Sequence, residues 1–182
     1  ALSPDSGGDG EESKARYLES SLRRLGLTDI ETFPAPDPRV SSGLRPNILV
    51  RLPGCRPQKT VWILTHMDVV PPGEASLWMS DPYRAEVRNG RIYGRGTEDN
   101  QQDLVASIFA LRAFCELRIR PDYNLGLALV SDEETSSLFG VRHLLDRADP
   151  VFRKDDLIVV PDFGDAQGTA IEIAEKSLYW LR

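Results

Sequence analysis

The sequence predicts an α/β fold in which helices flank a mixed, largely parallel central sheet. Three apolar runs of strand length, Val61–Leu64, Tyr123–Val130 and Leu157–Val160, are each followed by polar, mostly acidic residues. A short apolar run with polar boundaries is typical of a strand, and the first of these runs is typical of one buried on both faces. Segments with helical spacing alternate with these strands, which favours a parallel sheet.

Length, composition and charge suit one globular domain and exclude several functions. A chain of 182 residues can bury a sizeable core, and 41% hydrophobic with 27% charged residues argues against disorder. A net charge of −6 leaves no broad basic surface for nucleic acid or an anionic membrane. No apolar run approaches the length of a transmembrane helix. Cys55 and Cys115 form neither a disulfide framework nor a thiolate zinc motif, so we expect a cytoplasmic protein.

The first third of the chain predicts one helix followed by strands. Residues 11–25 place apolar side chains at helical spacing, with acidic residues first and basic residues late, and Gly26 ends the segment. Short strands are expected at residues 29–33 and 47–52. The Pro-rich run at 34–38 excludes a helix or a central strand.

The middle of the chain predicts a long loop, a hairpin and a buried helix. Residues 71–82 form a loop long enough to suggest a functional role. Asn89-Gly90 is the favoured two-residue turn of a β-hairpin over residues 86–93. Residues 103–117 are apolar on nearly all sides, which predicts a helix buried against the sheet. A short helix is expected around residues 141–145.

Side chains able to bind a cation follow three of the predicted strands and precede the long helix: His66 and Asp68, Glu133 and Glu134, Asp162, and Asp99. Parallel strands would bring these ends to one edge of the sheet. Taken singly, each acidic strand end is more often a solvated loop, and His-x-Asp is a weak pattern. Helix capping is the alternative for Asp99 and Asp103, and for Asp103 we prefer it. Their recurrence beside a histidine favours a metal site, because packed like charges need a counter-ion.

The types of candidate ligand limit which metal ions could bind and indicate how many. Imidazole with several carboxylates suits zinc, and manganese or cobalt share these preferences. The excess of carboxylates indicates two divalent ions about 3.5–4 Å apart that share a bridging carboxylate. Adjacent Glu133 and Glu134 allow one to bind metal while the other acts as a base.

Four motifs carry a family resemblance: Thr65-His-Met-Asp-Val-Val-Pro71, Gly94-Arg-Gly-Thr-Glu-Asp99, Ser131-Asp-Glu-Glu134 and Pro161-Asp162. In this order they resemble the motifs of the co-catalytic zinc exopeptidase and aminoacylase family. That family includes succinyl-diaminopimelate desuccinylase, acetylornithine deacetylase, glutamate carboxypeptidase, and the di- and tripeptidases. The resemblance covers the chain from about Gly8 to its end, and it implies the catalytic-domain fold of that family.

The resemblance also implies a role for each site residue. His66 would bind one metal, Asp68 would orient its imidazole, and Asp99 would bridge both metals. Glu133 is implied as the general base, with Glu134 a ligand of one metal and Asp162 of the other. A cis peptide is expected at Asp99–Asn100.

This chain differs from the family's usual pattern in two ways. Gln101-Gln102 stand where the family usually has Lys-Gly. The family's last metal-binding histidine lies beyond an inserted lid domain, whereas His143 here is expected to be a surface or packing residue. Residues 170–182 resemble the start of that lid. With no initiator Met, the chain is expected to be a fragment: residues 1–175 of the catalytic domain and 176–182 of a lid that dimerises in the family.

The expected activity is metal-dependent hydrolysis of the amide bond of a small peptide or an N-acyl amino acid, by a water that bridges the metals with Glu133 as general base. The resemblance weakly favours a peptidase, because Asp, as at position 162, is commoner in the family's di- and tripeptidases. One alternative is a deacylase of the N-acyl-diaminopimelate or ornithine type. Another is a truncated metal-binding domain that is inactive on its own, as we expect of the isolated 182 residues.

Overall fold

A five-stranded mixed sheet forms the centre of the molecule, in the strand order β1-β4-β8-β5-β9. The computed structural model describes residues 1–163 and 169–173. Along the chain the elements are η1 (Pro4–Ser6), α1 (Glu12–Arg24), β1 (Ile30–Thr32), β2 (Ala35–Pro36), β3 (Leu44–Arg45), β4 (Ile48–Leu52), β5 (Arg56–His66), η2 (Ala75–Leu77), β6 (Glu86–Arg88), β7 (Arg91–Tyr93), α2 (Gln101–Glu116), β8 (Tyr123–Val130), α3 (Val141–Leu145) and β9 (Leu157–Val159).

The three strands that carry the predicted site are parallel, as expected. β5 pairs with β8 and with β9 in parallel, whereas β4 is antiparallel to β8 and β1 is antiparallel to β4. His66 lies opposite Val130, and Ile63 lies opposite Val159. The carboxyl ends of β5, β8 and β9 therefore meet at one edge of the sheet, where open α/β folds bind their ligands.

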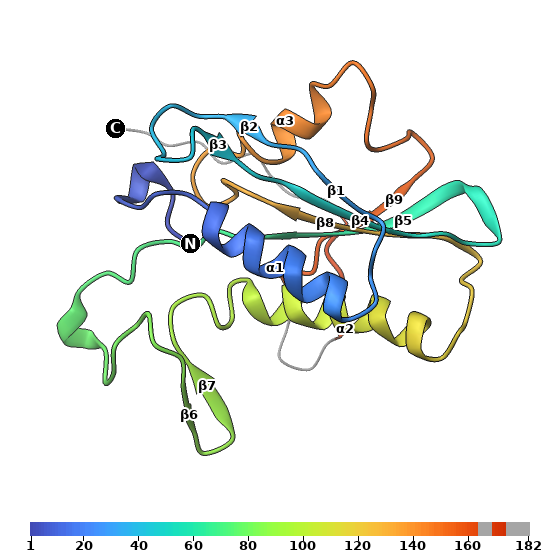
Figure 1. Cartoon of the computed structure of the whole chain (residues 1–182). Helices are drawn as coiled ribbons and strands as arrows, with labels where there is room; N and C mark the ends of the chain where they lie inside the picture. The colour runs from blue at the N-terminus through green and yellow to red at the C-terminus, as the bar shows by residue number, and fades with distance from the viewer. Residues whose placement is uncertain (164–168, 174–182) are drawn as a thin grey trace.

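Helices cover both faces of this sheet (Figure 1). α1 and α2 pack on one face, where Leu22, Leu104 and Leu111 meet Ile48 and Leu127. The opposite face is covered by α3, whose Leu144 belongs to a second apolar cluster; its other fully or largely buried members are Phe33, Leu49, Trp62, Leu64, Ala128 and Val130. The sheet is thus a rigid support between two apolar layers.

The structure corrects two predictions for the long helix. α2 begins at Gln101 with Asn100 as its N-cap residue, so Asp103 lies in the first turn and is not the cap. Only one side of α2 is buried: Leu104, Ile108 and Leu111 face the sheet, whereas Val105 and Phe109 are 49% and 51% exposed. The physical reason is geometric, since one sheet contacts one stripe of a helix and nothing in residues 1–163 or 169–173 covers the other sides.

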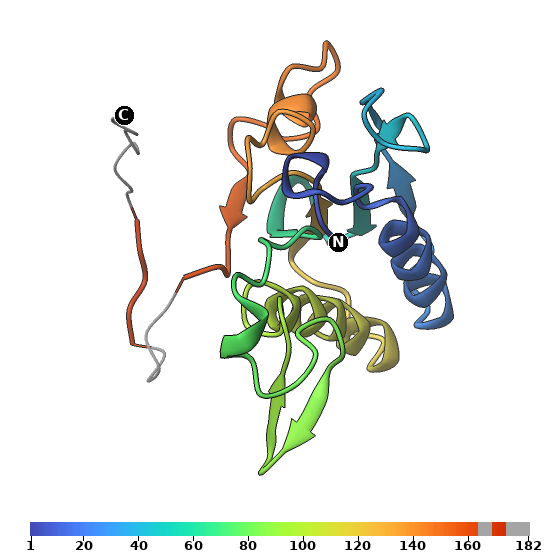
Figure 2. The same cartoon turned by 90° about the vertical axis from the view of Figure 1, so that its left-hand side faces the viewer.

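The remaining elements follow the sequence closely. The hairpin of β6 and β7 turns at Asn89 and Gly90, both with positive φ, and it projects from the body of the molecule (Figure 2).

β9 is apolar but lies at the edge of the sheet, and each of its residues is about half exposed. Among the described residues, no helix has the length and apolar character needed to cross a lipid bilayer.

Asp37 contributes to a pH-dependent ion cluster between β2 and the N-terminal segment. Its buried carboxylate accepts hydrogen bonds from Arg39 Nε and Nη2, both at 2.9 Å, while Arg39 Nη1 lies 3.0 Å from Asp5. The hydrogen bonds from Arg39 outweigh burial and lower the pKa of Asp37 to about 2. A carboxyl group whose pKa is lower in the folded state than in the unfolded state stabilises the fold at pH values above its unfolded-state pKa. This stabilisation is lost as the pH falls through the folded-state pKa.

We therefore expect Asp37→Asn to reduce the free energy of unfolding at pH 7 by about 2 kcal/mol, the magnitude of a hydrogen bond to a charged group. The difference from wild type should shrink between about pH 4 and pH 2, as the wild-type carboxylate is protonated. Urea titrations at pH 7, 4 and 2.5 measure this difference. Asp5→Asn, which removes the exposed partner of Arg39, is the control and should change stability little. A difference that stays constant with pH would contradict the prediction.

Candidate metal centre

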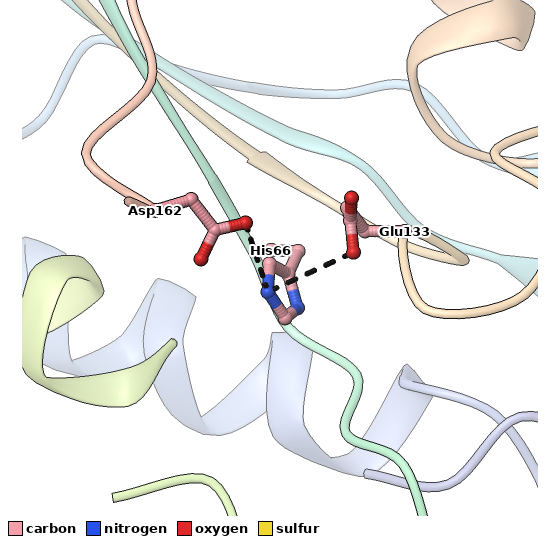
Figure 3. Close-up of side chains that lie close together, drawn as sticks. All are labelled: His66, Glu133 and Asp162. Atoms are coloured by element: carbon pink, nitrogen blue, oxygen red, sulfur yellow. Dashed lines mark ion pairs between the residues drawn. The ribbon is translucent and has the colours of Figure 1, made fainter. Parts of the chain in front are cut away.

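The carboxyl ends of three parallel strands and the start of one helix deliver the predicted ligands to one place. His66 is the last residue of β5, Glu133 and Glu134 follow β8, Asp162 follows β9, and Asp99 precedes α2. Figure 3 shows His66 between the carboxylates of Glu133 and Asp162, which approach its ring from opposite sides. The strand ends thus bring together residues almost a hundred positions apart in the chain.

The imidazole of His66 is the centre of the cluster. Its Nε2 atom lies 3.1 Å from Asp99 Oδ1, 3.6 Å from Asp162 Oδ2 and 3.9 Å from Glu133 Oε2. Two sets of ligand atoms each fall within 4.8 Å of one another: His66 with Glu133 and Asp162, and His66 with Asp99 and Glu134. All five side chains are therefore placed where cations could bind, and proximity alone does not separate a ligand from a base.

Asp68 joins the ends of β5 and β8. The Nδ1 atom of His66 lies 3.1 Å from the main-chain oxygen of Asp68 and 3.5 Å from its Oδ1. The Asp68 carboxylate accepts hydrogen bonds from the amides of Glu133 and Glu134, both at 3.1 Å. Because β5 ends at His66, the turn that follows the strand makes this contact. Asp68 thus contacts both the His66 ring and the amides of the two glutamates.

Asn100 belongs to the site, and the sequence analysis did not identify it. Its buried amide donates to Asp162 Oδ1 at 2.5 Å and contacts the Pro161 oxygen at 3.4 Å. The expected cis peptide at Asp99–Asn100 is present. A polar residue at the start of a helix usually indicates a cap, but Asn100 makes no side-chain capping bond. A second contact that no local pattern indicates is the hydrogen bond from the Val70 amide to Glu134 Oε1, at 3.2 Å.

The electrostatics of the cluster favour a bound cation. Burial lowers the pKa of His66, but contacts with the carboxylates of Asp162 and Asp68 outweigh burial and raise it to about 11. Burial, followed by the charge of Asp99, raises the pKa of Glu134 to about 7. Burial is also the main cause that raises the pKa of Glu133. Carboxylates held together against these penalties are typical of sites where a positive charge compensates them.

The donor set fits a divalent metal of the zinc type. One imidazole nitrogen and four carboxylates match the preferences of zinc, manganese and cobalt. The free cysteines Cys55 and Cys115 and the second histidine, His143, belong to neither ligand group. His143 lies half-buried on α3.

A cavity of about 400 Å³ opens beside the ligand cluster. His66, Glu133 and Asp162 form one part of its wall, and apolar side chains of the α3 region form another, among them Leu138, Val141 and Leu145. A small molecule in this cavity would lie next to the Glu133 carboxylate. Such a combination of an apolar wall and a few converging polar groups is typical of a ligand site.

Comparisons with known proteins agree with this geometry. An uncharacterized metallohydrolase of Methanocaldococcus jannaschii is 41% identical over 187 aligned residues, which cover 100% of this chain and 45% of that protein. Succinyl-diaminopimelate desuccinylase of Xanthomonas campestris is 43% identical over 82 residues, 45% of this chain and 22% of that enzyme. Human carnosine dipeptidase 1 superposes with a TM-score of 0.64 and 27% identity, over 82% of this chain and 32% of that structure.

Two facts follow from these comparisons. The chain spans about 45% of the length of the metallohydrolase relative that it matches throughout. The sequence model of peptidase family M20/M25/M40 matches residues 62–174, which include all six predicted site residues. The chain therefore belongs to peptidase family M20/M25/M40.

Proposed function

We propose that the protein is a metal-dependent hydrolase that cleaves the amide bond of a small peptide or an N-acyl amino acid. The observation that carries this proposal is the convergence of five ligand-type side chains from four chain segments around His66. It is supported by membership of the M20/M25/M40 family and by relatives named as a metallohydrolase, a desuccinylase and a dipeptidase.

His66, Asp99, Glu134 and Asp162 would hold two divalent ions, with Asp99 shared between them. Zinc fits the donors best, and cobalt or manganese are alternatives with similar preferences. Bound divalent ions lower the pKa of water and polarise a substrate carbonyl. Asp68 would keep the His66 ring in one orientation, because a partner on the second ring nitrogen fixes its tautomer.

Glu133 is proposed as the general base. It lies at the edge of the cavity, where its carboxylate could accept a proton from water and return it. Glu133 would take a proton from the attacking water and pass it to the nitrogen of the leaving amine. Glu134, whose Oε1 accepts a hydrogen bond from the Val70 amide, would bind metal.

A peptidase and a deacylase remain two candidate activities. Asp162 weakly favours a peptidase by family resemblance, and the fold of a dipeptidase matches most of the chain. The similarity to succinyl-diaminopimelate desuccinylase favours a deacylase as the second candidate. Both cleave the same type of bond, so the proposed roles of the site residues are common to them.

The wider context is also a proposal. Residues 1–175 would form the N-terminal part of the catalytic domain, and residues 176–182 the start of a lid through which the protein would dimerise; residues 174–182 lie outside the described part of the chain. The free cysteines suit a reducing compartment such as the cytoplasm. We expect the isolated 182 residues to be inactive and a longer chain with a further histidine ligand to be active.

We expect the full-length protein, loaded with zinc, to hydrolyse members of a panel of unblocked dipeptides and of N-succinyl and N-acetyl amino acids. Activity should fall to background after dialysis against a chelator and should return on addition of zinc, cobalt or manganese, because the ions would activate water and polarise the substrate carbonyl. Amine release and metal content, measured on the same samples, test this. Hydrolysis that survives complete metal removal, or no hydrolysis of either class by the loaded protein, would contradict the proposal.

A further inference from the structure

A fully buried ion network lies behind the loop that carries Glu133 and Glu134. Arg45, Glu11 and Asp132 are each 0% exposed. Arg45 donates from Nε and Nη2 to the two carboxylate oxygens of Glu11, both at 2.5 Å, and its Nη2 lies 3.6 Å from Asp132 Oδ1. Arg45 Nη1 also lies 3.4 Å from Asp37 Oδ2. Burial of charges is costly unless they are paired, so each member of the network depends on the others.

Asp132 accepts several of the hydrogen bonds that shape the loop after β8. The residue adopts a left-handed conformation with φ of 64°. Its carboxylate accepts hydrogen bonds from the hydroxyls of Thr135 and Ser136 and from the amide of Phe139, and its main-chain oxygen accepts from the amide of Ser137. The loop therefore folds around one buried carboxylate, and Glu133 and Glu134 lie in its first turn.

The residues that follow Arg45 hold both ends of the same loop. Pro46 accepts a hydrogen bond on its main-chain oxygen from the Ser131 hydroxyl, and Asn47 Oδ1 accepts from the Ser131 amide at 3.0 Å. Asn47 Nδ2 donates to the Phe139 oxygen at 2.8 Å. The guanidinium of Arg45 lies over the Phe139 ring, 5.4 Å from its centre. Three consecutive residues thus determine where the loop begins and where it ends.

We infer that Arg45 is a positioning residue that acts through Asp132 to set the location of Glu133 and Glu134. Its guanidinium lies beside the buried Asp132 carboxylate and helps to hold it in place, and Asp132 holds the loop. The loop then presents the amides of Glu133 and Glu134 to the Asp68 carboxylate. Removal of Arg45 leaves this loop without its counter-charge, and an error of about 1 Å in a reacting group can cost about 100-fold in rate.

If the ion network only stabilised the fold, a different pattern of amide exchange would be expected. Glu11 immediately precedes α1 and Arg45 ends β3, so the pair also joins two elements of the fold. If the network served only overall stability, its loss would raise the unfolded population and would affect all slowly exchanging amides together. If it positions the loop, the loss would be local.

The test is backbone hydrogen exchange, measured by NMR on the full-length zinc-loaded protein with Arg45→Met. Exchange at the amides of Glu133 and Glu134 should be faster by about tenfold or more, while the amides of Leu127 and Leu129 in β8 change by less than about twofold. Arg51→Met is the matched control, because Arg51 also pairs with a glutamate and lies over an aromatic ring, at the other end of β4. It should leave Glu133 and Glu134 unchanged.

Asp132→Asn provides a second route to the same answer, should Arg45→Met fail to fold. It keeps the side-chain volume but removes the charge and one acceptor oxygen, so the same two amides should exchange faster. Uniform acceleration along β8, or unchanged exchange at Glu133 and Glu134 in a folded variant, would overturn the inference.

A kinetic measurement extends the test, and this part alone depends on the proposed hydrolase function. On the panel substrate that is cleaved fastest, Arg45→Met should lower kcat by about 10- to 100-fold with KM nearly unchanged, when the variant is compared with wild type at equal zinc content. Arg45→Lys, which keeps the charge, should recover part of the loss. If no panel substrate is hydrolysed by the wild type, the proposed function fails, while the exchange result still decides whether Arg45 positions the loop.

Discussion

Glu133→Gln should reduce kcat of the full-length enzyme by about 10²- to 10⁴-fold, the usual contribution of a general base, while the zinc content stays at the wild-type value. The reason is that a carboxamide has nearly the size and shape of the carboxylate but cannot accept the proton from water. Glu133 is suited to this step because its side chain borders the cavity, whereas Glu134 does not line it. Steady-state kinetics and metal analysis on the same preparation measure both quantities.

Glu134→Gln is the matched control for this prediction. The two residues are adjacent, and both donate their amides to Asp68, yet only Glu134 is assigned as a ligand. We expect Glu134→Gln to lower the metal content as well as the activity. Near-normal turnover of Glu133→Gln would show that the base is another group. Loss of metal from Glu133→Gln would instead make Glu133 a ligand, as its grouping with His66 and Asp162 allows.

His66→Ala should weaken metal binding by more than about 100-fold, beyond the effect usual for residues that only support a ligand. The imidazole is common to both sets of ligand atoms, and its Nε2 is the nitrogen that faces the carboxylates. Without it, the remaining carboxylates would repel one another across the gap. Metal content after dialysis at a fixed free zinc concentration, measured by mass spectrometry, gives the change in occupancy.

His143→Ala is the control for His66→Ala, because the chain has two histidines and His143 lies on α3 outside both ligand groups. It should leave the metal content unchanged. Equal metal content in His66→Ala and wild type would remove His66 from the metal site and with it the proposed centre.

Local sequence patterns predicted the elements that position the site because each has a strong signature. The apolar run of β8 coincides with Tyr123–Val130, and the Asn89-Gly90 turn forms the predicted hairpin. His66, Glu133 and Asp162 could be grouped because a parallel sheet necessarily places its strand ends together. The family resemblance then supplied roles that the residue types alone left open, such as the choice between Glu133 and Glu134 as the base.

What the sequence could not give are contacts between distant segments. Asn100 binds Asp162, 62 residues away, through a side chain whose local pattern predicts only a cap. The ion pair of Arg45 with Glu11 joins residues 34 positions apart, and neither position has a periodicity that would reveal its partner. Acidic residues favour helix starts, which predicts Asp103 as a cap, but α2 begins two residues earlier, at Gln101. These cases share one cause, since burial and pairing are decided by the tertiary fold.

The most direct test of the central claim is a crystal structure of the full-length protein grown with zinc, with diffraction recorded on both sides of the zinc absorption edge. We expect two anomalous peaks about 3.5–4 Å apart, one of them about 2.0–2.1 Å from His66 Nε2 and both within about 2.2 Å of carboxylate oxygens from Asp99, Glu134 or Asp162. Anomalous peaks located only at other side chains, with these four residues free of metal, would contradict the account.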